Sequence, residues 1–359
     1  MTAQPAQVLP EEPPADATSA ADGTGSAADG QDIIALRLLV PPMCDGWRLD
    51  HFLKWRIERL SRTKIQWVIA EQIRFADGRR VRASSRVRAG ETICLDRPAP
   101  KEPEVPRHFE VLAEDEHFLA IDKPAGLPMH TSAKFWRNTL TALLREKYPN
   151  EPMQVCHRLD RETSGVLLVA RTPEAASWLK QSFALRRVKK SYLALVHGCP
   201  EPTSGTIDQP MKLLDTPTHL MMGVAIDGAP ARTRYSVTQR FAMHSLVRAD
   251  PETGRQHQIR VHLASLGHPI VGDKLYRASE ADFMAYCDHG LSEALLEKFD
   301  GLPRHALHAS RLAFPHPVSR QEVVVQSPLP ADLRAYIAQL PAFDGGAAAR
   351  TNVTEPSSQ

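Results

Sequence analysis

The sequence lacks several features that define whole classes of protein. No run approaches the ~18 consecutive apolar residues of a membrane-spanning helix, and the first residues offer neither the charged region nor the apolar core of a signal peptide. There are only five cysteines, an odd number with no Cys-x-x-Cys pair, which argues against a disulfide scaffold and a cysteine-built zinc site. We therefore expect a cytoplasmic protein that does not enter a membrane.

Nucleotide-binding motifs are also missing. No Gly-x-Gly-x-x-Gly stretch exists, so dinucleotide binding has no support. The segment 267–274 superficially resembles a phosphate loop, but Gly-Asp-Lys followed by Leu275 replaces the required Gly-Lys-Ser/Thr. His157-Arg158 resembles the start of a kinase catalytic loop, yet Leu159 breaks the His-Arg-Asp order.

The charge that is present is unevenly distributed. The 359 residues sum to a net charge of only +2, and 42% of them are apolar, enough for a sizeable core. Residues 1–36 hold six acidic and no basic residues, whereas residues 46–97 hold 13 Lys and Arg against six Asp and Glu. This concentration suggests a polyanionic partner, although a solvated basic surface would look the same.

Composition divides the chain into five parts. The Ala-, Pro-, Gly- and Asp-rich residues 1–36 predict a disordered acidic tail, and residues 345–359 predict a second disordered tail. The proline-rich residues 98–106 predict a linker. It separates a small domain at 46–97 from a larger one at 107–340.

The segment 46–97 reads as two helices and a hairpin. Ser61 can cap the second helix, and Asp77-Gly78 predicts the turn between two strands. Basic side chains stand at the helix start and on the strand face after the turn, where they favour RNA or DNA over a plain solvated surface. The candidate RNA-binding residues here are Arg62, Lys64, Arg80 and Arg82.

The order of these elements resembles the ribosomal-protein-S-four-type RNA-binding domain over residues 46–96. The resemblance implies RNA binding by the helix–helix–hairpin surface. It is carried by Arg48-Leu49-Asp50, Ser61-Arg62, Ile65-Gln66 and Gly90-Glu91.

The larger domain predicts a mixed α+β fold, because its strand candidates outnumber its helices and long loops join them. The apolar run 165–171 predicts a buried strand. Thr172-Pro173 then predicts a helix start, and 191–197 predicts another strand.

The densest polar cluster is the segment 157–165. Its Asp160 stands between Arg158 and Arg161, which would keep the carboxylate ionised. Such a carboxylate can act as a nucleophile or stabilise positive charge, and a surface salt-bridge turn is the alternative interpretation.

A second cluster covers residues 253–262. Alternating apolar and polar residues after position 258 predict a strand, on which Arg260 could bind a buried carboxylate through both arms of its guanidinium. A metal site is the alternative, but the spacing fits no zinc-protease helix, so core or RNA-facing histidines are favoured. The histidines in question are His257, His262, His305 and His308.

Taken together, the motifs of the larger domain resemble the RluA-type pseudouridine synthases. The motifs appear in the family's order along residues 107–330. They are Asp-Lys-Pro-Ala-Gly (122–126), His-Arg-Leu-Asp-x-x-Thr-Ser-Gly (157–165), Lys-x-Tyr (190–192), Thr-Gly-Arg-x-His-Gln-Ile-Arg-Val-His (253–262), Gly-His-Pro-Ile-Val-Gly-Asp (267–273) and Leu-His-Ala (307–309).

The resemblance implies an isomerase with a bent mixed sheet and a central cleft. It assigns Asp160 as the catalytic aspartate and Arg260 as the partner of the aspartate. It assigns Tyr192 as the residue packing under the base and leaves open a second role of this tyrosine in proton removal. It further assigns Arg158 to the space left by a flipped uridine. Arg255 and His257 would support the loop or touch phosphate.

The implied reaction converts uridine to pseudouridine in structured RNA, with large-subunit ribosomal RNA favoured over transfer RNA. It requires neither cofactor nor metal, and we expect a monomer. A non-catalytic ribosome-assembly factor and a nucleoside hydrolase are the rival interpretations. The insertion-like stretch 278–302 and the variant segment 128–130 depart from the family pattern and leave target choice open.

Overall fold

The computed structural model divides the chain into two compact units, Met1–Lys101 and Glu102–Gln359. The division falls inside the predicted linker. The predicted tail at 345–359 and most of the tail at 1–36 lie outside the described residues. The structure describes residues 24–26, 32–57, 60–98, 101–132, 134–216 and 220–343.

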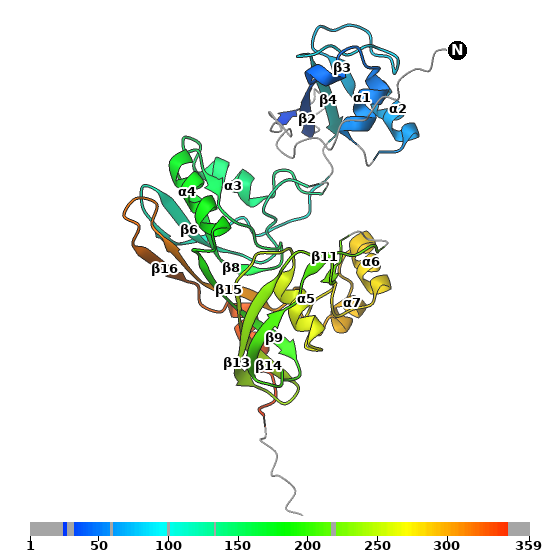
Figure 1. The fold of residues 1–359 in the computed structure, drawn as a ribbon. Helices are drawn as coiled ribbons and strands as arrows, with labels where there is room; N and C mark the ends of the chain where they lie inside the picture. The colour runs from blue at the N-terminus through cyan, green and yellow to red at the C-terminus, as the bar shows by residue number, and fades with distance from the viewer. Residues whose placement is uncertain are drawn as a thin grey trace, which may run out of the picture. The chain divides into compact units, whose positions relative to one another are not determined.

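The N-terminal unit joins one sheet to two helices (Figure 1). Its elements are β1 (Thr24–Ser26), β2 (Asp32–Leu39), the short 3₁₀ turn η2 (Pro42–Cys44), α1 (Leu49–Arg56), α2 (Arg62–Glu71), β3 (Ile73–Phe75) and β4 (Thr92–Pro98). The strand order is β1-β2-β4-β3. Phe52 of α1 and Ile65 of α2 pack with Ile93 of β4 into one core.

The prediction of disorder as far as residue 36 is wrong for residues 24–26 and 32–36. Residues 24–26 form β1, and residues 32–36 belong to β2, which pairs antiparallel with both β1 and β4. Ile34 is buried, and Leu36 and Leu38 pack against the core. The alternation of apolar residues in this segment determines that it forms a strand. The acidic composition of the preceding residues does not prevent it.

The second helix begins as predicted and a strand forms at Thr92–Pro98, but the strand expected directly after the Asp77-Gly78 turn does not form. The Ser61 hydroxyl accepts the Lys64 backbone N–H at 3.2 Å, which confirms the cap. Residues 79–91 form a loop with short turns. Their carbonyls bond to the start of α1 and not to a neighbouring strand; for example, the Leu49 backbone N–H donates to the Ser85 carbonyl at 2.8 Å. Arg80 and Arg82 are therefore exposed on a loop, not on a strand face.

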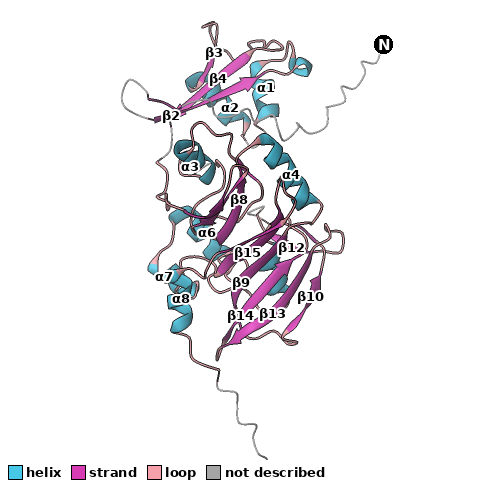
Figure 2. Cartoon of the chain, turned by 90° about the vertical axis from the view of Figure 1, so that its left-hand side faces the viewer, coloured by secondary structure: helices cyan, strands magenta, loops and turns pink. Residues whose placement is uncertain are grey.

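The larger unit has a mixed α+β fold, as predicted (Figure 2). Its strands form a 10-stranded sheet in which β8 and β15 are parallel and the other described pairs are antiparallel. The strand order along the sheet is β10-β13-β14-β9-β15-β8-β6-β5, with β16 paired to β15 and β7 paired to β8.

The strands of this unit and their bounds, in chain order, are β5 (Glu110–Glu114), β6 (Phe118–Lys123), β7 (Gln154–Val155), β8 (Ser164–Ala170), β9 (Lys189–His197), β10 (Ser204–Asp208), β11 (Met211–Leu213), β12 (Met222–Val224), β13 (Arg232–Arg240), β14 (His244–Pro251), β15 (Leu307–Pro315) and β16 (Glu322–Gln326). The helices are α3 (Leu140–Lys147), α4 (Pro173–Ala184), α5 (Gln258–Ser265), α6 (Glu280–His289), α7 (Glu293–Lys298) and α8 (Ala331–Ala338). Strands β11 and β12 pair only with each other, as a separate hairpin.

The central strand β8 is buried along its whole length, which confirms the prediction from its apolar run. Leu167 faces a core that includes α3, and Leu168 faces the other core, which includes α4. Alternate side chains of a strand point to opposite faces, so covering both faces requires a continuous apolar run. Thr172 caps α4 through the Ala175 N–H at 3.2 Å, also as predicted.

The predicted strand at 259–263 is wrong, because residues 258–265 form helix α5. Every residue from Gln258 to Leu263 is buried, so the helix shows no one-sided apolar stripe. The alternation of apolar and polar residues over 259–263 therefore led to a wrong prediction of a strand. Within the described residues, no helix has the length and apolar character needed to cross a bilayer.

Candidate active site

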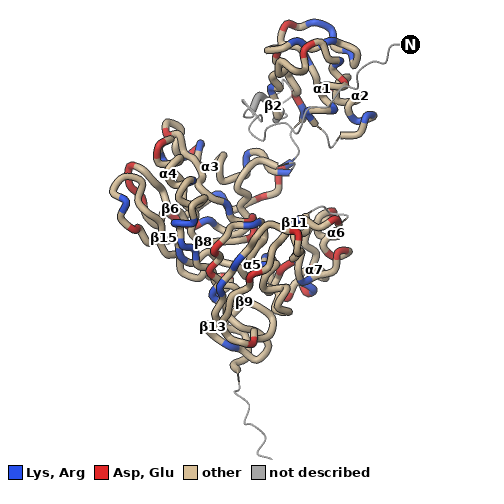
Figure 3. Tube along the Cα trace, in the orientation of Figure 1, with Lys and Arg blue, Asp and Glu red and all other residues tan. Residues whose placement is uncertain are grey.

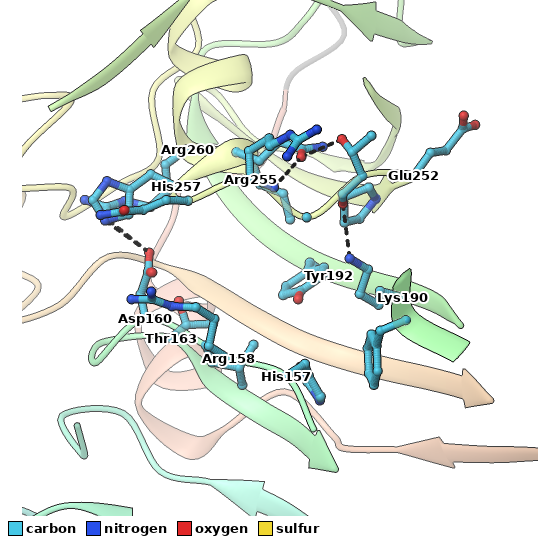
Figure 4. Close-up of a pocket in the computed structure, with 18 of the residues that line it drawn as sticks. His157, Arg158, Asp160, Thr163, Lys190, Tyr192, Glu252, Arg255, His257 and Arg260 are labelled. Atoms are coloured by element: carbon cyan, nitrogen blue, oxygen red, sulfur yellow. Dashed lines mark hydrogen bonds and ion pairs between the residues drawn. The ribbon is translucent and has the colours of Figure 1, made fainter. Parts of the chain in front are cut away.

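A cavity of about 600 Å³ opens where the loop before β8, strand β9 and the start of α5 meet (Figure 4). Its lining includes every site residue predicted in the larger unit, which are Arg158, Asp160, Tyr192, Arg255, His257 and Arg260. The four candidate RNA-binding residues Arg62, Lys64, Arg80 and Arg82 belong to the N-terminal unit.

The loop that carries Asp160 is fixed at its exit by Gly165. Its φ is +112°, and a Cβ built there would lie 2.2 Å from the Ala309 carbonyl oxygen of β15. Only glycine allows β8 and β15 to approach so closely. One turn earlier, the Thr163 N–H donates to the Asp160 carbonyl at 3.1 Å, which sets the bend that presents the carboxylate.

Lys123, the last residue of β6, also fixes this loop. Its ammonium donates to the carbonyls of Pro124, Arg161 and Thr163 at 2.8, 3.0 and 2.9 Å. Three donors thus meet three acceptors at a fully buried position. Burial and the neighbouring Arg304 lower the pKa of Lys123 to about 7.

Asp160 forms an ion pair with Arg260 of α5. Arg260 Nη1 donates to Asp160 Oδ2 at 3.0 Å, while Nε and Nη2 bind both oxygens of Asp273 at 2.7 and 2.9 Å. The buried carboxylate predicted to bind both arms of the guanidinium is therefore Asp273, which sequence reasoning missed. Arg161, expected beside Asp160, binds Glu162 and Tyr286 instead.

These contacts keep the candidate carboxylate ionised. Burial alone would raise the pKa of Asp160, but the interactions with His257 and Arg260 outweigh it and hold that pKa below its ordinary value. Burial, followed by the charge of Arg260, lowers the pKa of His257 to about 4. Because the imidazole is then neutral at pH 7, Arg260 supplies the positive charge.

Tyr192 lies in β9, only 9% exposed, and its side chain lines the cavity floor. Burial, and secondly the charge of Asp160, raise the pKa of this phenol well above its ordinary value. The hydroxyl therefore keeps its proton at neutral pH, so packing against a ring suits this side chain better than acting as a base.

The lining also includes several cations, beside one further acid, Glu252, and neutral residues. Arg158 is exposed at the cavity, and Arg255 Nε donates to the Pro230 carbonyl at 3.1 Å. Lys190 Nζ donates to the Thr253 carbonyl at 3.1 Å, and burial lowers its pKa to about 8. A site with an ionised acid and several cations suits a substrate that carries phosphates.

Residues 117–265 match the family described as RNA pseudouridylate synthase. The chain is 35% identical to ribosomal large subunit pseudouridine synthase D of Nitrosomonas europaea, over 89% of this chain and 92% of that protein. The chain belongs to the RNA pseudouridylate synthase family. It is also 30% identical to ribosomal large subunit pseudouridine synthase C of Vibrio cholerae, over 82% of this chain and 93% of that protein.

Solved structures agree with this assignment. The human protein RNA pseudouridylate synthase domain containing 1 superposes with a TM-score of 0.51 and 27% identity, over 68% of this chain and all of that chain. The RluA-type resemblance, the mixed-sheet fold and the isomerase class predicted from the motifs are thereby confirmed.

The insertion-like stretch of this synthase contacts the loop that carries Asp160. The Arg161 guanidinium donates to the hydroxyl of Tyr286 in α6 at 2.6 Å, and that hydroxyl lies 3.4 Å from Glu162. Glu162 also accepts two hydrogen bonds from the buried Lys274, at 3.0 and 2.9 Å. Glu162 does not line the cavity and instead joins a network of contacts that sequence reasoning did not foresee.

The four histidines considered as metal ligands each form a hydrogen bond with a different hydroxyl group. His262 contacts the Thr233 hydroxyl at 2.9 Å, and His308 contacts the Ser164 hydroxyl at 3.0 Å. His305 contacts the Thr163 hydroxyl at 2.8 Å, and His257 contacts the Tyr276 hydroxyl at 2.9 Å. His262, His305 and His308 are buried, whereas His257 lines the cavity.

Proposed function

We propose that this synthase converts uridines of large-subunit ribosomal RNA to pseudouridine, with Asp160 as the reacting carboxylate. The observation that carries the proposal is an ionised carboxylate, 21% exposed, held by Arg260 at the wall of a cavity lined by cations. The names of two relatives, which specify the ribosomal large subunit, support the choice of RNA.

The reaction sets the requirements for the site. The bond from ribose to the ring nitrogen must break, the uracil must turn, and a carbon–carbon bond must form in its place. Atoms and electrons balance within the nucleoside, so the chemistry itself needs no cofactor. We propose that the protein works as a monomer in the cytoplasm, where ribosomal RNA is available.

A stacked uridine cannot reach the carboxylate, so the base must leave the helix at a cost of a few kcal/mol. The exposed Arg158 is suited to fill the space that the base leaves, and Arg255 and Lys190 to bind the flanking phosphates. Tyr192 would pack against the detached ring and prevent its escape.

Asp160 can attack the ribose, attack the uracil ring or remove a ribose proton. Each route needs the carboxylate ionised and within reach of the nucleoside. The ion pair with Arg260 favours that state. The bond of Arg260 to Asp273 keeps the guanidinium from swinging into the cavity.

The N-terminal unit would supply affinity for the RNA. Arg62 and Lys64 are exposed at the start of α2, and Arg80 and Arg82 are exposed on the loop after β3. Figure 3 colours the Lys and Arg positions along the trace blue. Trp67 is 46% exposed, and the Lys64 ammonium lies 3.7 Å from its ring centre. An exposed aromatic ring among cations can stack on an unpaired base.

The test is to map pseudouridines in ribosomal and transfer RNA from cells with and without this gene. We expect sites in the large-subunit RNA to disappear and to return with the wild-type chain but not with Asp160→Asn. Loss of sites in transfer RNA alone would identify that RNA as the substrate. No loss in either RNA would favour the non-catalytic assembly factor.

A further inference from the structure

A line of contacts connects the β11–β12 hairpin to Asp160 through two side chains. The Met222 backbone N–H of β12 donates to the Tyr276 hydroxyl at 3.1 Å. That hydroxyl lies 2.9 Å from His257 Nδ1. On the other side of the imidazole, Nε2 lies 3.9 Å from Asp160 Oδ2.

The donors along this line fix the position of each proton. A backbone N–H can only donate, so the Tyr276 oxygen accepts from Met222 and has its own proton available for His257 Nδ1. Burial and Arg260 keep His257 neutral at pH 7. In a neutral imidazole whose Nδ1 accepts, Nε2 carries the proton, and here it faces Asp160.

The opposite tautomer would be unfavourable at two points. The Tyr276 oxygen would then accept two hydrogen bonds, and its own proton would have no partner among the contacts that the structure describes for it. The lone pair of Nε2 would also face the ionised carboxylate of Asp160. Repulsion between these electron pairs would disfavour the charged form of the acid.

The backbone and the neighbouring ring hold His257 in this position. His257 precedes α5 with a φ of 56°, in the left-handed region that non-glycine residues seldom adopt. The Tyr276 ring also lies 4.9 Å from the guanidinium carbon of Arg260. A single phenol therefore touches both groups that face the candidate carboxylate.

We propose that Tyr276 is a positioning residue that holds His257 as its Nε2–H tautomer beside Asp160. The 3.9 Å separation is longer than a hydrogen bond, so in the free protein the interaction is electrostatic. The gap leaves room for the contact to shorten when substrate fills the cavity. The catalytic part of this proposal depends on Asp160 being the reacting group.

The experiment is a nitrogen NMR spectrum of the protein labelled with ¹⁵N-histidine, with His257→Gln identifying the resonances of His257. In the wild type we expect His257 to have an unprotonated Nδ1 and a protonated Nε2. In Tyr276→Phe, which keeps the ring, we expect a mixture of tautomers. The same variant should lose about tenfold in kcat while KM for the RNA changes less than about twofold.

Tyr235→Phe is the matched control. Its hydroxyl donates to the Pro202 carbonyl at 3.0 Å from a buried position in β13, so it also loses one hydrogen bond. It should leave the His257 spectrum and kcat at wild-type values. An Nδ1–H or doubly protonated His257 in the wild type would overturn the proposal, as would unchanged tautomers or unchanged kcat in Tyr276→Phe.

The two proposals fail in different ways. The spectrum is recorded on the free protein, so it tests the tautomer whatever reaction the cavity performs. Turnover that persists in Asp160→Asn would refute the role of Asp160 while leaving the tautomer result in place.

Discussion

The two units of this synthase use charge in opposite ways. In the N-terminal unit, the candidate RNA-binding cations Arg62, Lys64, Arg80 and Arg82 are all exposed. In the larger unit, Arg260 is 7% exposed, and Asp273 and Lys123 are 0% exposed. Exposed charges are screened by salt and suit reversible binding, whereas buried charges fix the geometry of their neighbours.

Burying charge is costly unless each group finds partners. Asp273 meets this condition, because it accepts two hydrogen bonds from Arg260 and two from the backbone N–H groups of Leu275 and Tyr276. The resulting rigidity places Arg260 Nη1 at Asp160. We therefore expect substitutions of the buried charges in the larger unit to change chemistry or stability, and substitutions of the exposed cations in the N-terminal unit to change affinity.

The largest effect is expected for Asp160→Asn. Removing the carboxylate that we propose as the reacting group should lower turnover on the order of a thousandfold or more. RNA affinity should stay within about twofold, because the cations on both units are intact. Tritium release from RNA containing 5-tritiated uridine measures the first quantity, and filter binding measures the second. Persisting turnover would remove Asp160 from its role.

Asp273→Asn should destabilise the fold by about 3 kcal/mol, because it leaves Arg260 charged and buried without its main partner. Urea denaturation would measure the free energy of unfolding. The matched control is Asp227→Asn, which breaks an exposed pair with Lys212 and should leave the midpoint unchanged. Equal midpoints for the two variants would contradict the contrast between buried and exposed charge.

His305 should make the larger unit sensitive to acid. Burial, and secondly Arg260, lower its pKa from 6.5 to about 4 in the folded protein. Between these values the unfolded chain binds a proton that the folded chain does not, so stability falls as pH falls from 6.5 towards 4. His305→Gln should reduce this slope by about one proton, or about 1.4 kcal/mol per pH unit.

Urea midpoints of the wild type and of His305→Gln between pH 7 and pH 4.5 check this prediction. Parallel curves for the two proteins would show that His305 is not the titrating group.

The smallest effect is expected for the double variant Arg62→Ala with Lys64→Ala. Losing the two proposed phosphate contacts should weaken RNA binding and lower the slope of log affinity against log salt by about 2. Activity at saturating RNA should not change. Lys298→Ala removes one exposed cation of α7 and serves as the control. A slope that matches the control would contradict RNA binding by the start of α2.

Local patterns predicted the elements whose environment is simple. The apolar run of β8 specifies burial on both faces, and Ser61 and Thr172 specify helix starts, because capping depends on neighbours within three residues. The residues around the cavity were also predictable, because each motif that contains them is an unbroken segment of the sequence. The alternation in residues 259–263 failed as a guide because a helix buried on all sides has no polar face.

The sequence by itself determined the family, the mixed fold and the residues that surround the cavity. Only the tertiary structure decided which partners they have. Arg260 and Asp160 are 100 positions apart, Lys123 reaches a carbonyl 40 positions away, and Tyr276 reaches His257 from a different element. Pattern and propensity report on neighbours along the chain, whereas ion pairs and tautomers depend on distances that arise only when the sheet and α5 pack together.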